Sequence, residues 1–156
     1  MEKNWVFWLS SMYQNYSIGA FIENVMDFLI ILSDVKKTHT VLDCGTGLGT
    51  LAFKLADKID DGKVYALDVD DECVKYCNDL VAKKGLIYKI EVLKRSIDET
   101  KLQNALVDRV FSRSAIMYLK NKQKVFDEFY RILKDRGMVL AYEPIVGENI
   151  LEYINF

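Results

Sequence analysis

Three glycines at alternate positions, Gly45, Gly47 and Gly49, constrain the fold of this chain more than any other feature. They follow a short apolar segment at 40–43 and precede a segment with helical spacing at 48–60. Glycine is needed where the backbone turns sharply with positive φ, or where it must approach a ligand closely. A helix that begins directly afterwards points its free N–H groups at the same place. The pattern therefore predicts a strand, a turn and a helix that form a nucleotide-type site at the end of the strand.

The rest of the chain alternates short apolar segments with amphipathic ones. Further strands are expected at 63–69, 87–93, 108–112 and 138–142, further helices at 18–33, 70–84 and 123–134, and a turn at 135–137. Strands that alternate with helices of this length pair in parallel, and the helices cover both faces of the sheet. We therefore expect the α/β class, with one doubly wound, mainly parallel sheet.

The composition is that of an ordinary globular domain. The chain has 156 residues, of which 51% are apolar and 28% charged, and its net charge is −2; this length suits a single domain. A nucleic-acid-binding protein usually carries a clear basic excess, so no nucleic-acid partner is expected. The apolar run at 25–32 contains Asp27 and is far shorter than a membrane span. We expect one domain over 1–156 and no membrane span.

The three cysteines point to a reducing compartment. Cys44, Cys73 and Cys77 are odd in number and lack the spacing of a disulfide framework, which favours a cytoplasmic location. Cys73 and Cys77 are four residues apart, but the single histidine, His39, belongs to a different element. Two thiols without further ligands make a poor zinc site, so no metal is expected.

The spacing of the glycines discriminates between ligands. A dinucleotide fingerprint, G-x-G-x-x-G, would need its third glycine at position 50, where the chain has Thr50. This disfavours a nicotinamide-dependent oxidoreductase. Instead, Asp43 precedes the glycines, and Asp68 ends the second predicted strand, 21 residues after Gly47. A carboxylate in that position can accept hydrogen bonds from both hydroxyls of a ribose.

These residues resemble motif I and the next acidic position of the class I (Rossmann-like) S-adenosylmethionine (SAM) dependent methyltransferases, in particular the small-molecule, ubiquinone/menaquinone type. The resemblance implies the strand order 3-2-1-4-5, SAM as cofactor, and an Asp43 that suits the cofactor's ammonium group directly or through water. Asp43 as a cap of the turn and Asp68 as a helix cap are the alternatives. The implied cofactor-binding residues are Asp43, Gly45, Thr46, Gly47, Gly49, Asp68, Val69, Ser96, Ile97 and Ser112.

The chain departs from the resemblance after strand three. Many family members place an acidic residue there to bind the adenine amino group, whereas this chain has Ser96 and Ile97, with Asp98 following.

Two later segments support the resemblance. The segment 108–119 resembles strand four and its loop, where Ser112, Arg113 and Ser114 would border the sulfonium. The segment 130–140 is similar to the family's turn into strand five, with Asp135 and Arg136 replacing the usual Pro-Gly.

The two ends of the chain depart from this core, which is expected at 18–144. Residues 1–17 are dense in aromatics without a clean period and are expected to form a cap segment, in which Tyr13 and Tyr16 either cover the cofactor or pack in the core or an interface. Residues 145–156 are expected to be a tail that cannot form the family's usual C-terminal strand hairpin. Strand five should then be an exposed edge, which makes a homo-oligomer through that edge possible.

The resemblance implies a SAM-dependent methyltransferase that acts on an unidentified, small-molecule acceptor. The alternative is a non-catalytic SAM-binding or interaction domain derived from such an enzyme. A sulfonium is already an activated leaving group, so holding the reactants in line and excluding water can suffice. A base is needed only if the acceptor must lose a proton, and the sequence nominates no catalytic residue.

Overall fold

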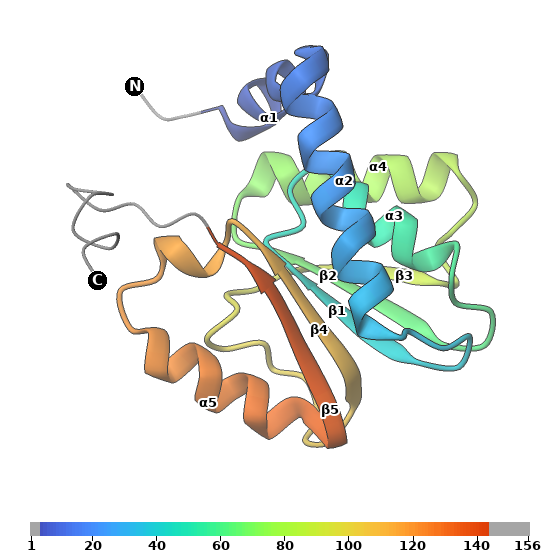
Figure 1. Cartoon of the computed structure of the whole chain (residues 1–156), viewed down its shortest axis with the longest axis vertical. Helices are drawn as coiled ribbons and strands as arrows, with labels where there is room; N and C mark the ends of the chain where they lie inside the picture. The colour runs from blue at the N-terminus through green and yellow to red at the C-terminus, as the bar shows by residue number, and fades with distance from the viewer. Residues whose placement is uncertain (1–3, 144–156) are drawn as a thin grey trace, which may run out of the picture.

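The computed structural model describes residues 4–143 and is organised around one sheet of parallel strands (Figure 1). The strands are β1 (Thr40–Cys44), β2 (Lys63–Asp68), β3 (Ile90–Lys94), β4 (Val107–Arg113) and β5 (Leu133–Tyr142). The helices are α1 (Trp5–Gln14), α2 (Tyr16–Ser33), α3 (Thr50–Ala56), α4 (Asp71–Lys83), the 3₁₀ turn η1 (Ile116–Tyr118) and α5 (Lys122–Ile132). The sheet order is β3-β2-β1-β4-β5, with every neighbouring pair parallel, which confirms the expected fold. The tail predicted at 145–156 lies outside the described residues.

Helices cover both faces of the sheet. Side chains alternate between the faces along each strand, so Val41 and Leu42 of β1 are fully buried in two different hydrophobic clusters. The first cluster joins α2, α3 and α4 to one face, and the second joins α5 to the other. Asp43 follows Leu42 and therefore lies on the face of the three helices, at the carboxyl end of β1.

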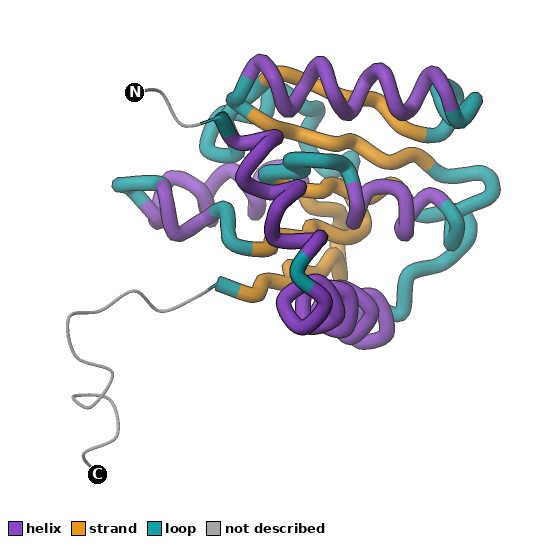
Figure 2. The backbone as a smooth tube through the Cα atoms, turned by 90° about the horizontal axis from the view of Figure 1, so that it is seen from above, coloured by secondary structure: helices purple, strands orange, loops and turns teal. Residues whose placement is uncertain are grey.

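The helix predicted from residue 18 begins two residues earlier, because the aromatic segment before it is itself a helix. Asn4 and Asn15 are the N-caps of α1 and α2: their side chains accept hydrogen bonds from the N–H groups of Phe7 (2.8 Å) and Ile18 (3.1 Å). In the view that shows α2 end-on, α1 runs across it, so the two helices meet at a sharp angle (Figure 2). Asn15 therefore ends one helix and caps the next.

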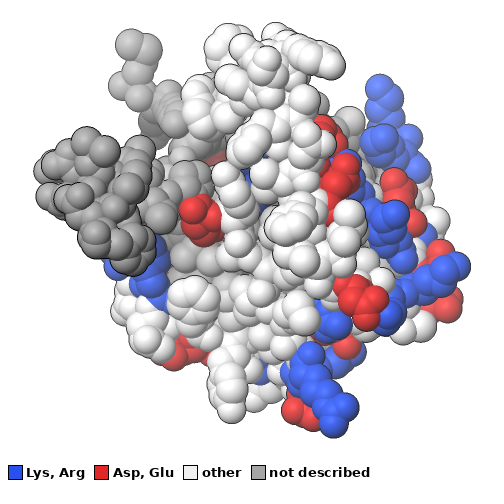
Figure 3. All heavy atoms as spheres, in the orientation of Figure 1, with Lys and Arg blue, Asp and Glu red and all other residues white. Residues whose placement is uncertain are grey.

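Helix α2 presents an apolar face on both of its sides. Its inner side chains pack into the first cluster, while Phe21, Phe28 and Ile31 are 55%, 59% and 75% exposed. Uncharged side chains cover most of the surface over this helix (Figure 3). By length and composition alone α2 could cross a membrane. Its inner side chains pack against the sheet, and 33% of the helix is buried.

Three predicted segments had wrong boundaries. The helix expected at 48–60 is the shorter α3, which begins at Thr50 and ends at Ala56. The strand expected at 87–93 starts at Ile90, because Ile87 and Tyr88 lie exposed in the turn after Gly85 and do not pair. The turn expected at 135–137 is instead a bulge within β5, where the register with β4 shifts and Arg136 adopts a φ of 60°. As expected, β5 is an edge strand with largely exposed side chains. Association through this edge stays a prediction.

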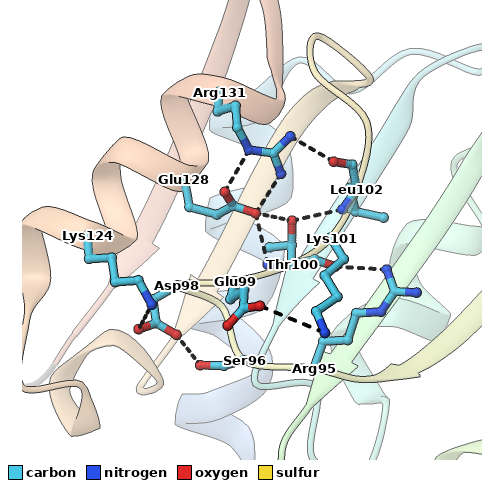
Figure 4. A network of polar contacts seen from close by, with 10 residues as sticks. All are labelled: Arg95, Ser96, Asp98, Glu99, Thr100, Lys101, Leu102, Lys124, Glu128 and Arg131. Atoms are coloured by element: carbon cyan, nitrogen blue, oxygen red, sulfur yellow. Dashed lines mark hydrogen bonds and ion pairs between the residues drawn. The ribbon is translucent and has the colours of Figure 1, made fainter.

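The crossover from β3 to β4 runs as loop rather than helix through the described residues 95–106. A network of polar contacts fastens it to α5 (Figure 4). Glu128 accepts hydrogen bonds from the Thr100 N–H at 2.8 Å and from two guanidinium nitrogens of Arg131, and Arg131 also donates to the Leu102 carbonyl at 2.8 Å. Because Ile97 and Leu102 are buried beneath this network, the loop closes the second face of the sheet.

Candidate cofactor and acceptor site

The loop between β1 and α3 needs glycine for two reasons. Gly45 and Gly47 have φ of 67° and 53°, a region that other residues rarely adopt. A Cβ at Gly45 would lie 2.5 Å from the Cβ of Ala115, and one at Gly47 would lie 2.8 Å from Leu9 Cδ1. The loop is therefore sandwiched between α1 and the segment that follows β4.

Asp43 is a buried carboxylate at the bottom of this loop. Its side chain is almost inaccessible and accepts a hydrogen bond from the Thr46 hydroxyl at 2.7 Å. Burial raises the pKa of Asp43 to about 6, against the smaller opposing effects of the Thr46 bond and the Arg113 charge. The Thr46 bond means that Asp43 does stabilise the turn. Its charge remains largely uncompensated, so a cationic group beside it would be strongly favoured.

Asp68 ties the end of β2 to the glycine loop. One carboxylate oxygen accepts the Gly47 N–H at 2.8 Å, and the other accepts the Asp70 N–H at 3.0 Å. The N-cap of α4 is Asp70, whose side chain accepts from the Cys73 N–H at 2.9 Å. Asp68 therefore is not the helix cap, and each of its oxygens keeps acceptor capacity for a hydroxyl pair.

A cavity of about 400 Å³ opens above the carboxyl ends of the strands. Eight of the ten predicted binding residues line it: Asp43, Gly45, Thr46, Gly47, Asp68, Val69, Ser96 and Ile97. Gly49 does not line it. It is the N-cap of α3 with a φ of 80°, and a Cβ there would meet Cys77 and Phe53 instead. Ser112 is also absent from the lining, since it is fully buried and its hydroxyl donates to Glu143 at 2.6 Å.

The adenine end predicted by the sequence lies at the start of the β3–β4 loop. The Ser96 hydroxyl donates to the side chain of Asp98, which in turn pairs with Lys124 of α5 at 3.1 Å. Ile97 is nearly inaccessible and contributes an apolar surface beneath the cavity. The acidic side chain that family members place directly here is thus displaced by two positions, and it faces α5.

The cavity has a second wall that the motifs did not identify. Helix α1 contributes five side chains to it, Trp5, Trp8, Leu9, Met12 and Tyr13. The rings of Trp5 and Tyr118 meet edge to face with centroids 5.6 Å apart, which joins α1 to η1. Tyr13 thus lines the cavity, whereas Tyr16 is 89% exposed and does not. The capping asparagines Asn4 and Asn15 were the sequence signal for this helix.

Glu143, also missed, shapes the loop after β4. Its carboxylate accepts hydrogen bonds from the Ser112 hydroxyl and from the N–H groups of Ala115, Ile116 and Met117, the last three at 3.1–3.2 Å. Within the same loop Ser114 adopts a φ of 58°. One carboxylate, on the residue directly after β5, therefore holds the turn that brings Arg113, Ala115 and Tyr118 to the cavity.

Comparisons with known proteins identify the family of this chain. A family model described as a methyltransferase domain matches residues 35–152. The ubiquinone/menaquinone biosynthesis C-methyltransferase UbiE of Enterobacter sp. (strain 638) is 26% identical over 123 residues, which are 76% of this chain and 49% of that protein. Malonyl-[acyl-carrier protein] O-methyltransferase 2 of Ilyobacter polytropus is 24% identical over 112 residues, 71% of this chain and 41% of that protein. The chain thus spans less than half the length of these relatives.

Solved structures show the same fold. A SAM-dependent methyltransferase from Aquifex aeolicus superposes with a TM-score of 0.65 at 34% identity, covering 70% of this chain and 58% of that one. A protein from Methanococcus maripaludis, described as a SAM-dependent methyltransferase, reaches a TM-score of 0.78 at 20% identity and covers 90% of this chain and 65% of that one. Together the comparisons confirm the expected family and its cofactor, SAM. The chain belongs to the family of methyltransferase domains.

Proposed function

We propose that this domain binds SAM in the cavity above β1 and β2 and transfers its methyl group to a small-molecule acceptor. One observation carries the proposal: two carboxylates, Asp43 and Asp68, end adjacent parallel strands and line the same cavity. A ligand with a cationic group at one end and a hydroxyl pair at the other matches them. A cytoplasmic location, expected from the cysteines, is part of the proposal.

The residues that line the cavity match the chemical groups of the cofactor. Asp43 is buried and carries a raised pKa, so it offers a site for an ammonium group. Asp68 keeps unused acceptor capacity. Gly45 and Gly47 line the cavity and carry no side chain, so their backbone is exposed to it while Ala115 and Leu9 pack directly against the loop. Asp43, Asp68 and the backbone between them would therefore hold the amino-acid end and the ribose.

SAM supplies, when bound, a methyl group on a positively charged sulfur. The chain's contribution is to position the two reactants and to exclude water, and a base is needed only if the acceptor must lose a proton. The loop held by Glu143 and the α1 side chains Trp5 and Leu9 enclose the cavity on the side away from the sheet. Burial raises the pKa of the cavity thiol Cys73 to about 12, so this thiol stays protonated and does not compete as a nucleophile.

A small-molecule acceptor is favoured by the surface and by the relatives. The net charge of −2 lacks the basic excess that a nucleic-acid substrate would need. The cavity lining also includes the aromatic side chains of Trp5, Trp8 and Tyr118. The relatives' names refer to ubiquinone/menaquinone biosynthesis and to malonyl-[acyl-carrier protein]. These are two different acceptors, so the acceptor of this chain is left open.

Isothermal titration calorimetry with SAM, followed by a methyl-release assay with a panel of metabolites, tests the proposal. We expect a dissociation constant in the micromolar range and methyl transfer to at least one member of the panel. Binding without transfer across the panel would support the alternative of a non-catalytic SAM-binding domain. A wild-type protein that binds no SAM would contradict both functions.

A further inference from the structure

Arg113 stands apart from the other arginines of the chain. It is the last residue of β4, it is half-buried, and it lines the cavity. The other four all have partners: Arg95, Arg109 and Arg131 donate to backbone carbonyls, and Arg136 lies 4.0 Å from its neighbour Asp135. Among the contacts of residues 4–143, the Arg113 guanidinium makes no hydrogen bond or ion pair.

The guanidinium nitrogens of Arg113 have no hydrogen-bond partner among the described residues and are not buried, so their five N–H donors are open to a ligand in the cavity that Arg113 lines. The charge of Arg113 lowers the pKa of Asp43, against the larger effect of burial, and the register of β1 and β4 places Asp43 beside Phe111, two residues before Arg113. Glu143 lies under the same loop, but its oxygens are used by Ser112 and by three backbone N–H groups. The other cavity guanidinium, Arg95, donates to the Thr100 carbonyl at 2.8 Å.

We propose that Arg113 binds a carboxylate of a ligand in this cavity, an inference that rests on the proposed function. The planar guanidinium fork matches a carboxylate with two parallel hydrogen bonds, which a lysine cannot reproduce. The carboxylate has two possible sources. It belongs either to the amino-acid end of SAM, whose ammonium group would then face Asp43, or to an acidic methyl acceptor. Both sources share the same chemistry at Arg113.

The first arm of the test asks whether the cofactor supplies the carboxylate. Calorimetry compares SAM with decarboxylated SAM, which lacks only that group, on the wild type, Arg113→Ala and Arg113→Lys. If SAM is the source, Arg113→Ala weakens SAM binding at least tenfold and leaves decarboxylated SAM unchanged, with Arg113→Lys in between. The matched control is Arg136→Ala, since Arg136 is 94% exposed and remote in sequence from the cavity residues; it should change neither affinity.

The second arm asks whether the acceptor supplies it. The protein is saturated with S-adenosylhomocysteine and titrated with benzoate, a simple aromatic carboxylate. If the acceptor is the source, the wild type binds benzoate, Arg113→Ala binds it at least tenfold more weakly, and SAM affinity is the same in both. Either pattern supports the inference and assigns the source. Unchanged SAM affinity in Arg113→Ala overturns it when benzoate binds both proteins equally or binds neither.

Failure of this inference is distinguishable from failure of the proposed function. If the wild type binds SAM and transfers a methyl group while Arg113→Ala behaves identically in both arms, only the role of Arg113 is refuted. If the wild type binds no SAM, the proposed function itself fails. Thermal unfolding of Arg113→Ala should lie close to that of the wild type, because the side chain makes no hydrogen bond or ion pair within the described residues; a melting temperature that matches the wild type then separates a binding defect from misfolding.

Discussion

The buried hydroxyl of Ser112 donates a 2.6 Å hydrogen bond to the carboxylate of Glu143, which joins β4 and β5 at their carboxyl ends. The same carboxylate accepts three backbone N–H groups from the loop that leads into η1. The residue that follows the edge strand thereby holds a loop that lines the cavity. The interaction spans 31 residues of sequence and depends on the β4–β5 register.

Replacing Glu143 should therefore affect stability and the site together. Glu143→Ala leaves a buried hydroxyl and several N–H groups without their acceptor, and hydrogen bonds to a charged group contribute about 1.5–3 kcal/mol each. Because the neighbouring N–H groups are partly reachable by water, we expect a total loss of about 2–3 kcal/mol in urea unfolding. Glu143→Gln keeps one acceptor oxygen and should lose less. Equal stability of all three proteins would contradict this account.

The sequence alone predicted the elements that depend on residues close together along the chain. The alternating glycines and Asp43 predicted the β1–α3 loop, and the spacing to Asp68 predicted the end of β2. The structure brings Asp43 and Asp68 to one cavity because carboxyl ends of neighbouring parallel strands lie at the same edge. Family resemblance supplied the strand order, which no local pattern encodes.

The sequence did not predict the features that depend on contacts between distant segments of the chain. Ser112 follows the motif but turns to Glu143 rather than into the cavity, a choice that depends on a partner far along the chain. The aromatic residues of α1 carry no clean period, and no residue of this helix is fully buried, so a pattern of core positions could not reveal it. The β3–β4 crossover is loop because contacts from Glu128 and Arg131 replace the packing that a helix would provide.

Removing the Asp68 carboxylate should weaken cofactor binding. Asp68→Ala deletes the proposed acceptor for the ribose hydroxyls, and we expect a loss of about 1–3 kcal/mol, roughly a 5- to 150-fold higher dissociation constant for SAM by calorimetry. Asp68→Asn keeps an acceptor for the Gly47 N–H and separates loop geometry from the charge. The exposed Asp61 provides the control, as Asp61→Ala should leave the constant unchanged. An unaltered constant in Asp68→Ala would refute the ribose role.

The Glu128 network should make the loop at 95–104 sensitive to acid. The hydrogen bond from Arg131 lowers the pKa of Glu128 from 4.5 to about 2, so the stabilisation is present above pH 4.5 and is lost as the pH falls through 2. We expect Glu128→Gln to lose on the order of 2 kcal/mol at pH 7, after discounting for the partly exposed Arg131.

A surface pair provides the control for Glu128. Glu99 and Lys101 are 3.8 Å apart and about two thirds exposed, so Glu99→Gln should change stability by less than about 0.5 kcal/mol. Urea unfolding at pH 7 measures both variants. If Glu128→Gln and Glu99→Gln lose the same small amount, the network does not hold the loop.

The ionisation of Asp43 should make the stability of the fold depend on pH in the opposite direction. Burial raises its pKa from 3.8 to about 6, so the folded state holds the proton more tightly than the unfolded chain does. Its contribution to stability is therefore fully present below pH 3.8 and is lost as the pH rises through 6, a difference of roughly 3 kcal/mol. Asp43→Asn keeps an oxygen for the Thr46 hydroxyl and carries no charge. We expect this variant to be more stable than the wild type at pH 8, by up to that amount, and equally stable at pH 4.

The affinity for SAM should depend on pH in the direction opposite to that of stability. A cationic ammonium group beside Asp43 favours the ionised carboxylate, so wild-type affinity for SAM should fall as the pH drops below about 6. Asp43→Asn should bind SAM more weakly at pH 8 and lose this pH dependence, while the exposed Asp135→Asn should keep both affinity and profile. Urea unfolding and calorimetry at pH 4, 6 and 8 measure the two effects. If Asp43→Asn were less stable than the wild type at pH 8 yet bound SAM normally, Asp43 would be a structural cap of the turn, and the cavity would need another partner for the cation.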